Sequence, residues 1–146
     1  MSMFGEEYPM RELSEEECWE RLAGEHFGRL AFLMVDELHL VPINYALDGR
    51  SLLFRTAGGN KLFAVVLSHD VVFEIDHVSE QQNLAWSVIV RGFPRLLEED
   101  EAHRAEQVGL RSWVDIRKDS VVEITATSVS GREFRLTRPW LDAPTD

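Results

Sequence analysis

The sequence predicts a mainly β fold, a small barrel of six antiparallel strands with helices at its periphery. Six apolar or alternating stretches between residues 29 and 136 have the length and residue types of strands. Asp48-Gly49, between two of them, is the strongest short hairpin signal. Six antiparallel strands of this length favour closure, because open sheet edges tend to pair with other chains.

The chain reads as one domain. Its 146 residues suit a single hydrophobic core, and 45% hydrophobic with 28% charged residues is a globular balance that argues against disorder. We expect residues 1–12 to be a loosely held lead-in, residues 13–137 to form the domain, and residues 138–146 to be an irregular tail.

The first half of the chain predicts one helix followed by three strands. Ser14 and Glu17 have the spacing of a capping box, which satisfies the free N–H groups at a helix start. Gly24 or Gly28 can end that helix. The strands are then expected at Arg29–Val35, Leu38–Ala46 and Ser51–Thr56, with a short turn at Asp36–Glu37.

The second half predicts three more strands and two short helices. Gly92 and Pro94 interrupt one long strand, where we expect a bend. The elements are expected at Lys61–Ser68 (helix), Val71–Val78 (strand), Leu84–Leu97 (strand), Glu98–Leu110 (helix) and Val121–Ser128 (strand, prolonged by Gly131–Leu136).

The net charge limits which binding partners the protein can have. Lys and Arg number 15 against 26 Asp and Glu, a net charge of −11. Such a surface repels nucleic acids and anionic lipid, so we expect neither nucleic-acid nor membrane binding. The chain has no apolar run of the ~18 residues that span a bilayer, and residues 1–11 lack the pattern of a signal peptide. The expected location is the cytoplasm.

The sequence offers no metal site and no assignable catalytic residue. A single cysteine, Cys18, excludes an intrachain disulfide and a cysteine-based metal centre. No Gly-x-Ser-x-Gly elbow is present. The five histidines have no metal-ligand spacing, so we expect structural or surface roles for His26, His39, His69, His77 and His103.

The most informative segment runs from Arg55 to Lys61. A predicted strand ends in Arg55 and Thr56, two glycines follow, and a predicted helix begins near Asn60 and Lys61. A helix start attracts anions, and guanidinium, hydroxyl and ammonium groups can converge on one phosphate. The segment therefore indicates phosphate binding, with a solvated strand end and an ordinary turn as the alternative. It is not a P-loop, because Leu62 follows Lys61.

Two other segments could line a ligand pocket. Pro42 cannot donate a ladder hydrogen bond, so it marks an edge, a bulge or a place where a ligand replaces a strand, and Asn44 adds an amide beside it. The alternative is an edge proline with a surface asparagine. Ser87 and Arg91 could form a far wall, although alternation along this strand also fits simple packing of Trp86 and Val88.

The order of these segments resembles the flavin-binding split-barrel family related to pyridoxamine 5′-phosphate oxidase, and is most similar to its nitroimidazole-resistance-like branch. The resemblance covers about Leu13 to Phe134. It depends on four motifs: Gly28-Arg29-Leu30-Ala31, Val41-Pro42-Ile43-Asn44-Tyr45, Leu53-Phe54-Arg55-Thr56-Ala57 with Gly59-Asn60-Lys61, and Trp86-Ser87-Val88-Ile89-Val90-Arg91-Gly92.

The resemblance implies a split barrel that binds FMN at the interface of a homodimer and acts as an oxidoreductase on a small organic substrate. It implies phosphate contacts from Arg55, Thr56 and Lys61, with Asn60 beside them. It places the strand of Pro42, Ile43 and Asn44 along the flavin ring, and the strand of Trp86, Ser87 and Val88 near the cofactor.

The sequence departs from the oxidases that act on vitamin B6, because no counterpart of their C-terminal Arg/His substrate segment follows Phe134. An F420-dependent reductase and a non-catalytic flavin- or haem-binding protein are the alternatives. The Arg55, Thr56 and Lys61 set favours a phosphorylated ligand over haem, but it does not separate FMN from F420. The substrate, the electron donor and the role of Trp113 stay open.

Overall fold

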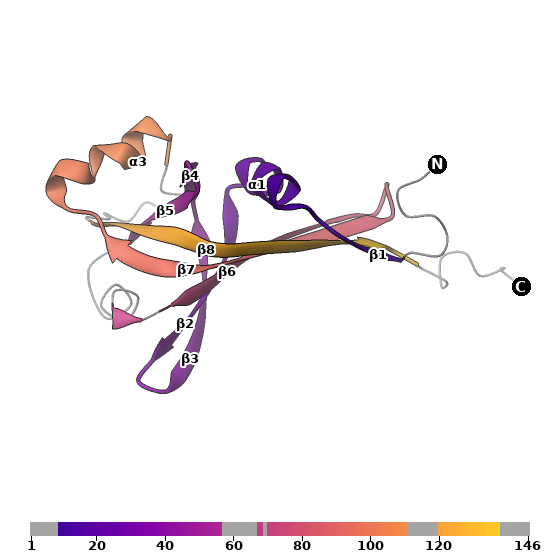
Figure 1. Cartoon of the computed structure of the whole chain (residues 1–146), viewed down its shortest axis with the longest axis horizontal. Coiled ribbons are helices and arrows are strands. Elements are labelled where there is room, and N and C mark those ends of the chain that lie inside the picture. Colours follow the sequence, from indigo (N-terminus) through magenta and orange to yellow (C-terminus); the bar gives the residue numbers. More distant parts are fainter. Residues whose placement is uncertain (1–8, 57–66, 69, 111–119, 138–146) are drawn as a thin grey trace, which may run out of the picture.

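The computed structural model describes residues 9–56, 67–68, 70–110 and 120–137. Strands dominate it (Figure 1). The elements are, in chain order, β1 (Met10–Glu12), α1 (Glu15–Ala23), β2 (Phe27–Met34), β3 (Glu37–Asn44), β4 (Ala46–Asp48), β5 (Ser51–Thr56), β6 (Val71–Ser79), β7 (Leu84–Leu96), a 3₁₀ helix (Glu99–Glu101), α3 (His103–Gln107) and β8 (Ser120–Arg135).

One antiparallel sheet contains all the strands, in the order β3-β2-β6-β7-β8-β5-β4, with β1 added on β8. The two ends of this order, β3 and β4, are consecutive in the chain and are separated only by Tyr45. The sheet therefore curls until its first and last strands meet. The predicted fold class, a mainly β antiparallel split barrel with peripheral helices, is confirmed.

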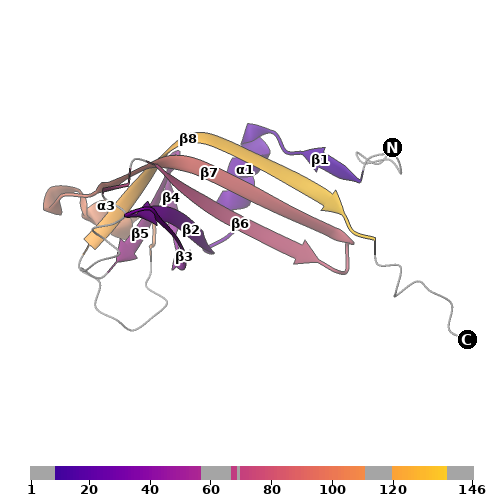
Figure 2. The ribbon, with the colours of Figure 1, turned by 90° about the horizontal axis from the view of Figure 1, so that it is seen from below.

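The long strands β7 and β8 give the sheet its bend. Their register shifts between Arg91 and Gly92, and a Cβ added at Gly92 would lie 2.2 Å from the Thr125 carbonyl oxygen. Such a bulge bends a strand and raises its twist, so the bend expected at Gly92 is confirmed. Beyond the barrel, β6, β7 and β8 continue as a three-stranded extension that carries β1 (Figure 2).

Two hydrophobic clusters fill the fold. The larger one lies inside the barrel and includes Cys18 and Leu22 of α1, both fully buried. The smaller one lies between β5 and the segment of α3, where Leu53, Ala105 and Leu110 pack together. The helix α1 starts at the predicted capping box, in which the Glu17 N–H donates to Ser14 Oγ and the Ser14 N–H donates to Glu17 Oε1.

The strand count of six is wrong, because the described residues form eight. Tyr45 divides the predicted strand Leu38–Ala46 into β3 and β4, and Met10–Glu12 pairs with β8 from within the stretch expected to be a lead-in. The hairpin turn lies at Val35 and Asp36, which both have positive φ, one residue before the expected position.

The helix expected over Glu98–Leu110 is also wrong as a single element. The Glu101 and Ala102 N–H groups donate to the carbonyls of Glu98 and Glu99, which closes tight 3₁₀ turns before α3 begins. Gly109, with φ of +71°, follows the end of α3. The expected helix at Lys61–Ser68 and the glycine turn before it lie outside the described residues, apart from Leu67 and Ser68.

Candidate functional site

The barrel is split where β3 leaves β5. The pairing of β4 with β5 ends at Ala46 and Leu53. The same register continued by two residues would set Asn44 opposite Arg55, but among the described strands β3 has only β2 as its ladder partner. The two strands stay in contact without forming a ladder. We call this place, where β3 and β5 are neighbours without a shared ladder, the split, and we take it as the candidate site.

Tyr45 holds the split open. Its backbone N–H donates to the His26 carbonyl at 2.9 Å, and its hydroxyl donates to the Leu22 carbonyl at 2.6 Å. Its ring packs edge-on against Phe73, with 4.9 Å between ring centroids. The hydroxyl of Tyr45 is thus bound to the last turn of α1 and its backbone N–H to the residue just before β2, so Tyr45 turns away from β5.

The β5 side of the split provides a cation. Arg55 is half-buried opposite Val121, and Thr56 lies opposite Ser120. Within the described residues Arg55 forms no ion pair. By contrast, six other arginines are each bound to at least one carboxylate: Arg11, Arg21, Arg29, Arg50, Arg95 and Arg104. Among the described residues Arg91 and Arg132 also lack an ion pair, but both are exposed, on β7 and β8. An arginine without a carboxylate in so acidic a chain is free to bind a ligand anion.

The β3 side of the split carries the three predicted residues of the second motif. Pro42 is exposed opposite Arg29, and Asn44 is half-buried opposite Phe27. Ile43 points the other way and packs against the barrel core. Of the three expectations for Pro42, a sheet edge, a bulge or a place where a ligand replaces a strand, the structure shows the edge, since β3 is the first strand of the sheet order.

A compact charge cluster lies beside Pro42. Arg29 donates through Nε to Glu74 Oε1 at 3.0 Å and bridges to Asp76 Oδ2 at 2.9 Å. Burial raises the pKa of Glu74, and its hydrogen bond with Asp76 adds to this effect, while Arg29 opposes it. The guanidinium of Arg29 is therefore occupied by carboxylates, and Arg55 is the arginine that borders the split without such a partner among the described residues.

The structure does not bring the third motif to the split. In the sheet order, β2 and β6 separate β7 from β3, and β8 separates it from β5. Trp86 and Val88 point into the barrel core, and the Arg21 guanidinium lies 5.4 Å from the Trp86 ring centroid. Ser87 lies between Asp76 and Arg132 on the opposite face. A role for these three residues in cofactor binding stays a prediction.

Other predicted positions fall outside the described residues. Asn60, Lys61 and Trp113 belong to this group, so the full phosphate set is represented here by Arg55 and Thr56. Within the described ranges, no group of three or more His, Cys, Asp or Glu side chains could hold a metal ion. In the same ranges no helix has the length and hydropathy needed to cross a membrane.

Sequence reasoning missed Tyr45 and the segment that holds it. Tyr45 was recognised only as the last residue of a motif, with no role of its own. His26 was expected to be structural or at the surface, and its side chain is indeed exposed, but the bond to its carbonyl was not foreseen. Hydrogen bonds to residues about 20 positions away leave no periodic signal in a sequence, and Asn44-Tyr45-Ala46 contains no turn residue of the usual kind apart from asparagine.

Comparison with known proteins agrees with this geometry. An uncharacterized protein of Mycobacterium tuberculosis is 38% identical over 89 residues, which are 60% of this chain and 79% of that protein. A Corynebacterium glutamicum structure, provisionally named a pyridoxamine 5′-phosphate oxidase, has 33% identity and a TM-score of 0.77, covering 92% of this chain and 100% of that one.

A second solved structure is described as the FAD binding protein of Mycobacterium smegmatis. It has 31% identity and a TM-score of 0.67, and the match covers 86% of this chain and 99% of that one. The family model described as pyridoxamine 5′-phosphate oxidase matches residues 14–133. The family match and the structural similarity agree with the split-barrel fold, and the chain belongs to the pyridoxamine 5′-phosphate oxidase family.

Proposed function

We propose that the chain binds FMN at the split and acts as a flavin-dependent oxidoreductase on a small organic substrate. The observation that carries this proposal is Arg55, a half-buried arginine at the β5 side of the split that has no carboxylate partner among the described residues. A phosphorylated ligand would supply the missing anion. The 31% identical Mycobacterium smegmatis relative, described as binding FAD, supports a flavin as that ligand.

The residues of the split fit the parts of FMN. Arg55 and Thr56 would hold the phosphate together with Lys61 and Asn60. The edge of β3 at Pro42, Ile43 and Asn44 would lie along the ring, where backbone groups and the Asn44 amide match the hydrogen-bonding pyrimidine edge. When bound, the flavin supplies the electron transfer itself. The chain's task is then to orient the ring and to keep water from one of its faces.

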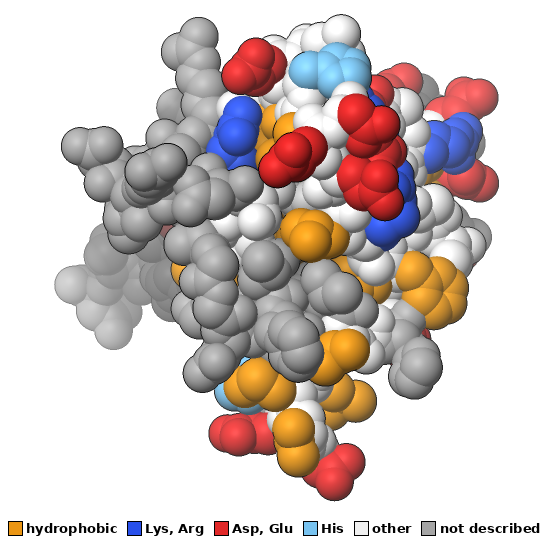
Figure 3. All heavy atoms as spheres, turned by 90° about the vertical axis from the view of Figure 1, so that its left-hand side faces the viewer, with side chains coloured by type: hydrophobic (Ala, Val, Ile, Leu, Met, Phe, Trp, Pro, Cys, Tyr) orange, Lys and Arg blue, Asp and Glu red, His pale blue; other side chains and the backbone are white. Residues whose placement is uncertain are grey.

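A homodimer would complete the site, because a single split covers a flat ring from one side only. The β2–β3 hairpin supports such an assembly. Leu38 and Leu40 of β3 are 77% and 68% exposed, and Leu33 of β2 and Val35 of the turn are 56% and 93% exposed. Apolar side chains gather on this hairpin in the lower part of Figure 3. Monomeric proteins rarely expose a contiguous patch of this kind.

Flavin titration tests the phosphate assignment. Arg55→Gln should raise the dissociation constant for FMN by roughly 10- to 100-fold, the effect of losing a charge-assisted hydrogen bond of about 1.5–3 kcal/mol. The matched control is Arg50→Gln, since Arg50 pairs with Glu15 at the β4–β5 turn, away from the split. Quenching of flavin fluorescence measures both. Equal FMN affinity in wild type and Arg55→Gln would refute the assignment.

The ligand itself is identified by a comparison of flavins. Riboflavin lacks the phosphate and should bind at least tenfold more weakly than FMN, whereas FAD tests whether the adenylate of the relative's cofactor is also accepted. Turnover is then assayed with NADPH and a quinone or nitroaromatic acceptor. A protein that binds FMN but oxidises no NADPH in this assay would be a flavin-binding protein without this activity.

A further inference from the structure

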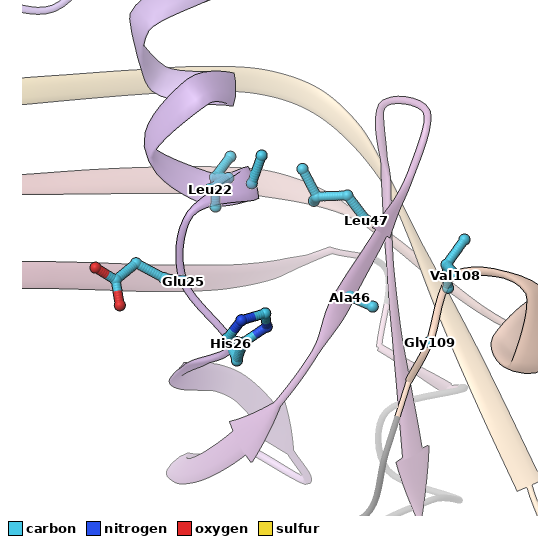
Figure 4. Close-up of a pocket in the computed structure, with 8 residues that line it drawn as sticks. Leu22, Glu25, His26, Ala46, Leu47, Val108 and Gly109 are labelled. Carbon is cyan, nitrogen blue, oxygen red and sulfur yellow. The ribbon is translucent and has the colours of Figure 1, made fainter.

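A separate cavity of about 260 Å³ lies between α1, β4 and the end of α3 (Figure 4). Leu22 and Ala23 border it from α1, Ala46 and Leu47 from β4, and Val108 and Gly109 from the segment after α3. All of these residues belong to the described part of the chain. Nothing in the flavin proposal uses this cavity.

The cavity lies at the border between the two hydrophobic clusters, whose side chains do not fill the space there. We call this border the seam. Leu22 belongs to the barrel cluster and Leu47 packs against it, whereas Ala46 and Val108 pack against the cluster of α3. Side chains at the seam are small where α1 and β4 approach each other, at Ala23 and Ala46. The apolar part of the lining is therefore supported by both clusters, while Ala23, His26 and Gly109 are exposed.

One end of the cavity is polar. Glu25 and His26 lie there, opposite the end formed by Val108, and the Glu25 carboxylate points away from the other lining side chains while the His26 ring lies beside them (Figure 4). Within the described residues the Glu25 carboxylate forms no ion pair. The backbone at this end is fixed, because the carbonyls of Leu22 and His26 both accept hydrogen bonds from Tyr45. The two polar side chains thus project from an anchored loop.

Size and polarity define what the cavity can hold. A volume of roughly 150 Å³ binds a bare benzene ring, and drug-sized ligands need roughly 300 Å³ or more. A cavity of about 260 Å³ thus suits one substituted ring and is too small for a three-ring flavin. The Glu25 carboxylate at the rim disfavours anions, and the imidazole of His26 can accept a hydrogen bond.

We propose that this cavity binds a one-ring aromatic compound that is uncharged or cationic and carries a hydrogen-bond donor. The ring lies on Leu47, Ala46 and Val108, and the donor faces the imidazole of His26. The cavity and the split share one connecting residue, since Tyr45 bonds to the cavity's loop and separates β3 from β4. The proposal stands whether or not the split holds a flavin.

Titration of the flavin-free, ¹⁵N-labelled full chain tests it, with 4-methylphenol as the probe and 4-methylbenzoate as its anionic counterpart. Saturable shifts in the amide resonances of His26, Ala46, Leu47 and Gly109 are expected with 4-methylphenol. The benzoate should bind at least tenfold more weakly. Shifts that do not saturate, or that cluster elsewhere in the chain, would overturn the proposal, as would equal binding of the two probes.

Two variants separate cavity binding from surface binding. Ala46→Leu fills the seam and should weaken 4-methylphenol at least tenfold, whereas Ala85→Leu, the same change at a half-buried position of β7 away from the cavity, should not. If Ala46→Leu fails to fold, His26→Ala tests the polar end, because it should reduce the preference for 4-methylphenol over toluene. An unchanged affinity in a folded Ala46→Leu variant, or an unchanged preference in His26→Ala, contradicts the proposal.

Discussion

The backbone N–H of Tyr45 donates to the His26 carbonyl and its hydroxyl donates to the Leu22 carbonyl, so neither group forms a hydrogen bond with β5. A tyrosine whose hydroxyl has a buried carbonyl partner is stable in a core, and here that bond also fixes where the barrel stops pairing. Burial, with the nearby Glu25 carboxylate, raises the pKa of the Tyr45 phenol. The phenol is therefore a hydrogen-bond donor throughout the physiological pH range.

Glu17 links three elements through Arg11. The guanidinium of Arg11 donates to both Glu17 oxygens at 3.0 Å and to Glu133 Oε2 at 2.6 Å, which joins β1, α1 and β8. Hydrogen bonds from Arg11, and then from the Ser14 backbone, lower the pKa of Glu17 to about 2. A carboxyl whose pKa is lower in the folded than in the unfolded chain stabilises the fold above its unfolded pKa.

Acid should therefore weaken this junction. The free energy of unfolding is expected to fall as the pH drops from about 5 to about 2, and Glu17→Gln should make that fall shallower. Urea unfolding at a series of pH values measures it. The control is Glu16→Gln in the same helical turn, where the side chain is exposed. If Glu17→Gln and wild type lose stability in parallel over this range, the junction has no such role.

At the scale of elements, α1 packs closely on the sheet at Gly131 of β8, where there is no room for a side chain. A Cβ at Gly131 of β8 would lie 2.9 Å from Cys18 Sγ, 2.9 Å from Leu13 Cδ1 and 3.0 Å from the Ser87 carbonyl oxygen. Neither the buried sulfur nor the neighbouring strand can move aside without loss of packing. The position requires glycine because of this close approach of α1 to the sheet.

Gly131→Ala should lower the stability by about 2 kcal/mol, the usual cost of overpacking a core. Gly24→Ala is the matched control, since its new Cβ would meet nothing closer than 3.7 Å at the end of the same helix. Thermal or urea unfolding compares the two. A Gly131→Ala variant as stable as Gly24→Ala would mean that α1 shifts without penalty.

Local signals in the sequence were sufficient for some elements and not for others. The start of α1 could be predicted because a capping box is a contact over three residues. The alternation in β6 could be predicted because one of its faces is buried and the other is not. The division at Glu99–Glu101 and α3 could not, because charged residues at helical spacing do not separate a 3₁₀ turn from an α-helix.

The candidate site shows the same limit at the scale of the whole molecule. Arg55 and Pro42 were predicted as site residues from separate motifs, and the structure sets their strands on the two sides of one split. That Trp86 and Val88 lie away from the split could not be predicted, because the residue pattern of a strand does not show which strands are its neighbours in the sheet. The cavity at Ala46 depends on two clusters meeting, which needs the three-dimensional arrangement.

The proposed homodimer makes a prediction for the intact chain. Wild type should elute with about twice the mass of 16.8 kDa, and Leu40→Glu should shift it to a monomer, because a charge in an apolar interface is costly to desolvate. Leu96→Glu, on β7 and 39% exposed, is the control. Size-exclusion chromatography with light scattering measures the mass. A monomeric wild type, or a dimeric Leu40→Glu, would contradict the use of this hairpin.

The last strand also determines when the protein can fold. Strand β8 pairs with β1, β5 and β7. Each of these three strands therefore needs residues 120–135 to complete its ladder. During synthesis residues 120–135 emerge after all of these strands, so the sheet cannot be completed before they have been made. The many long-range pairings imply slow folding, on the order of milliseconds to seconds.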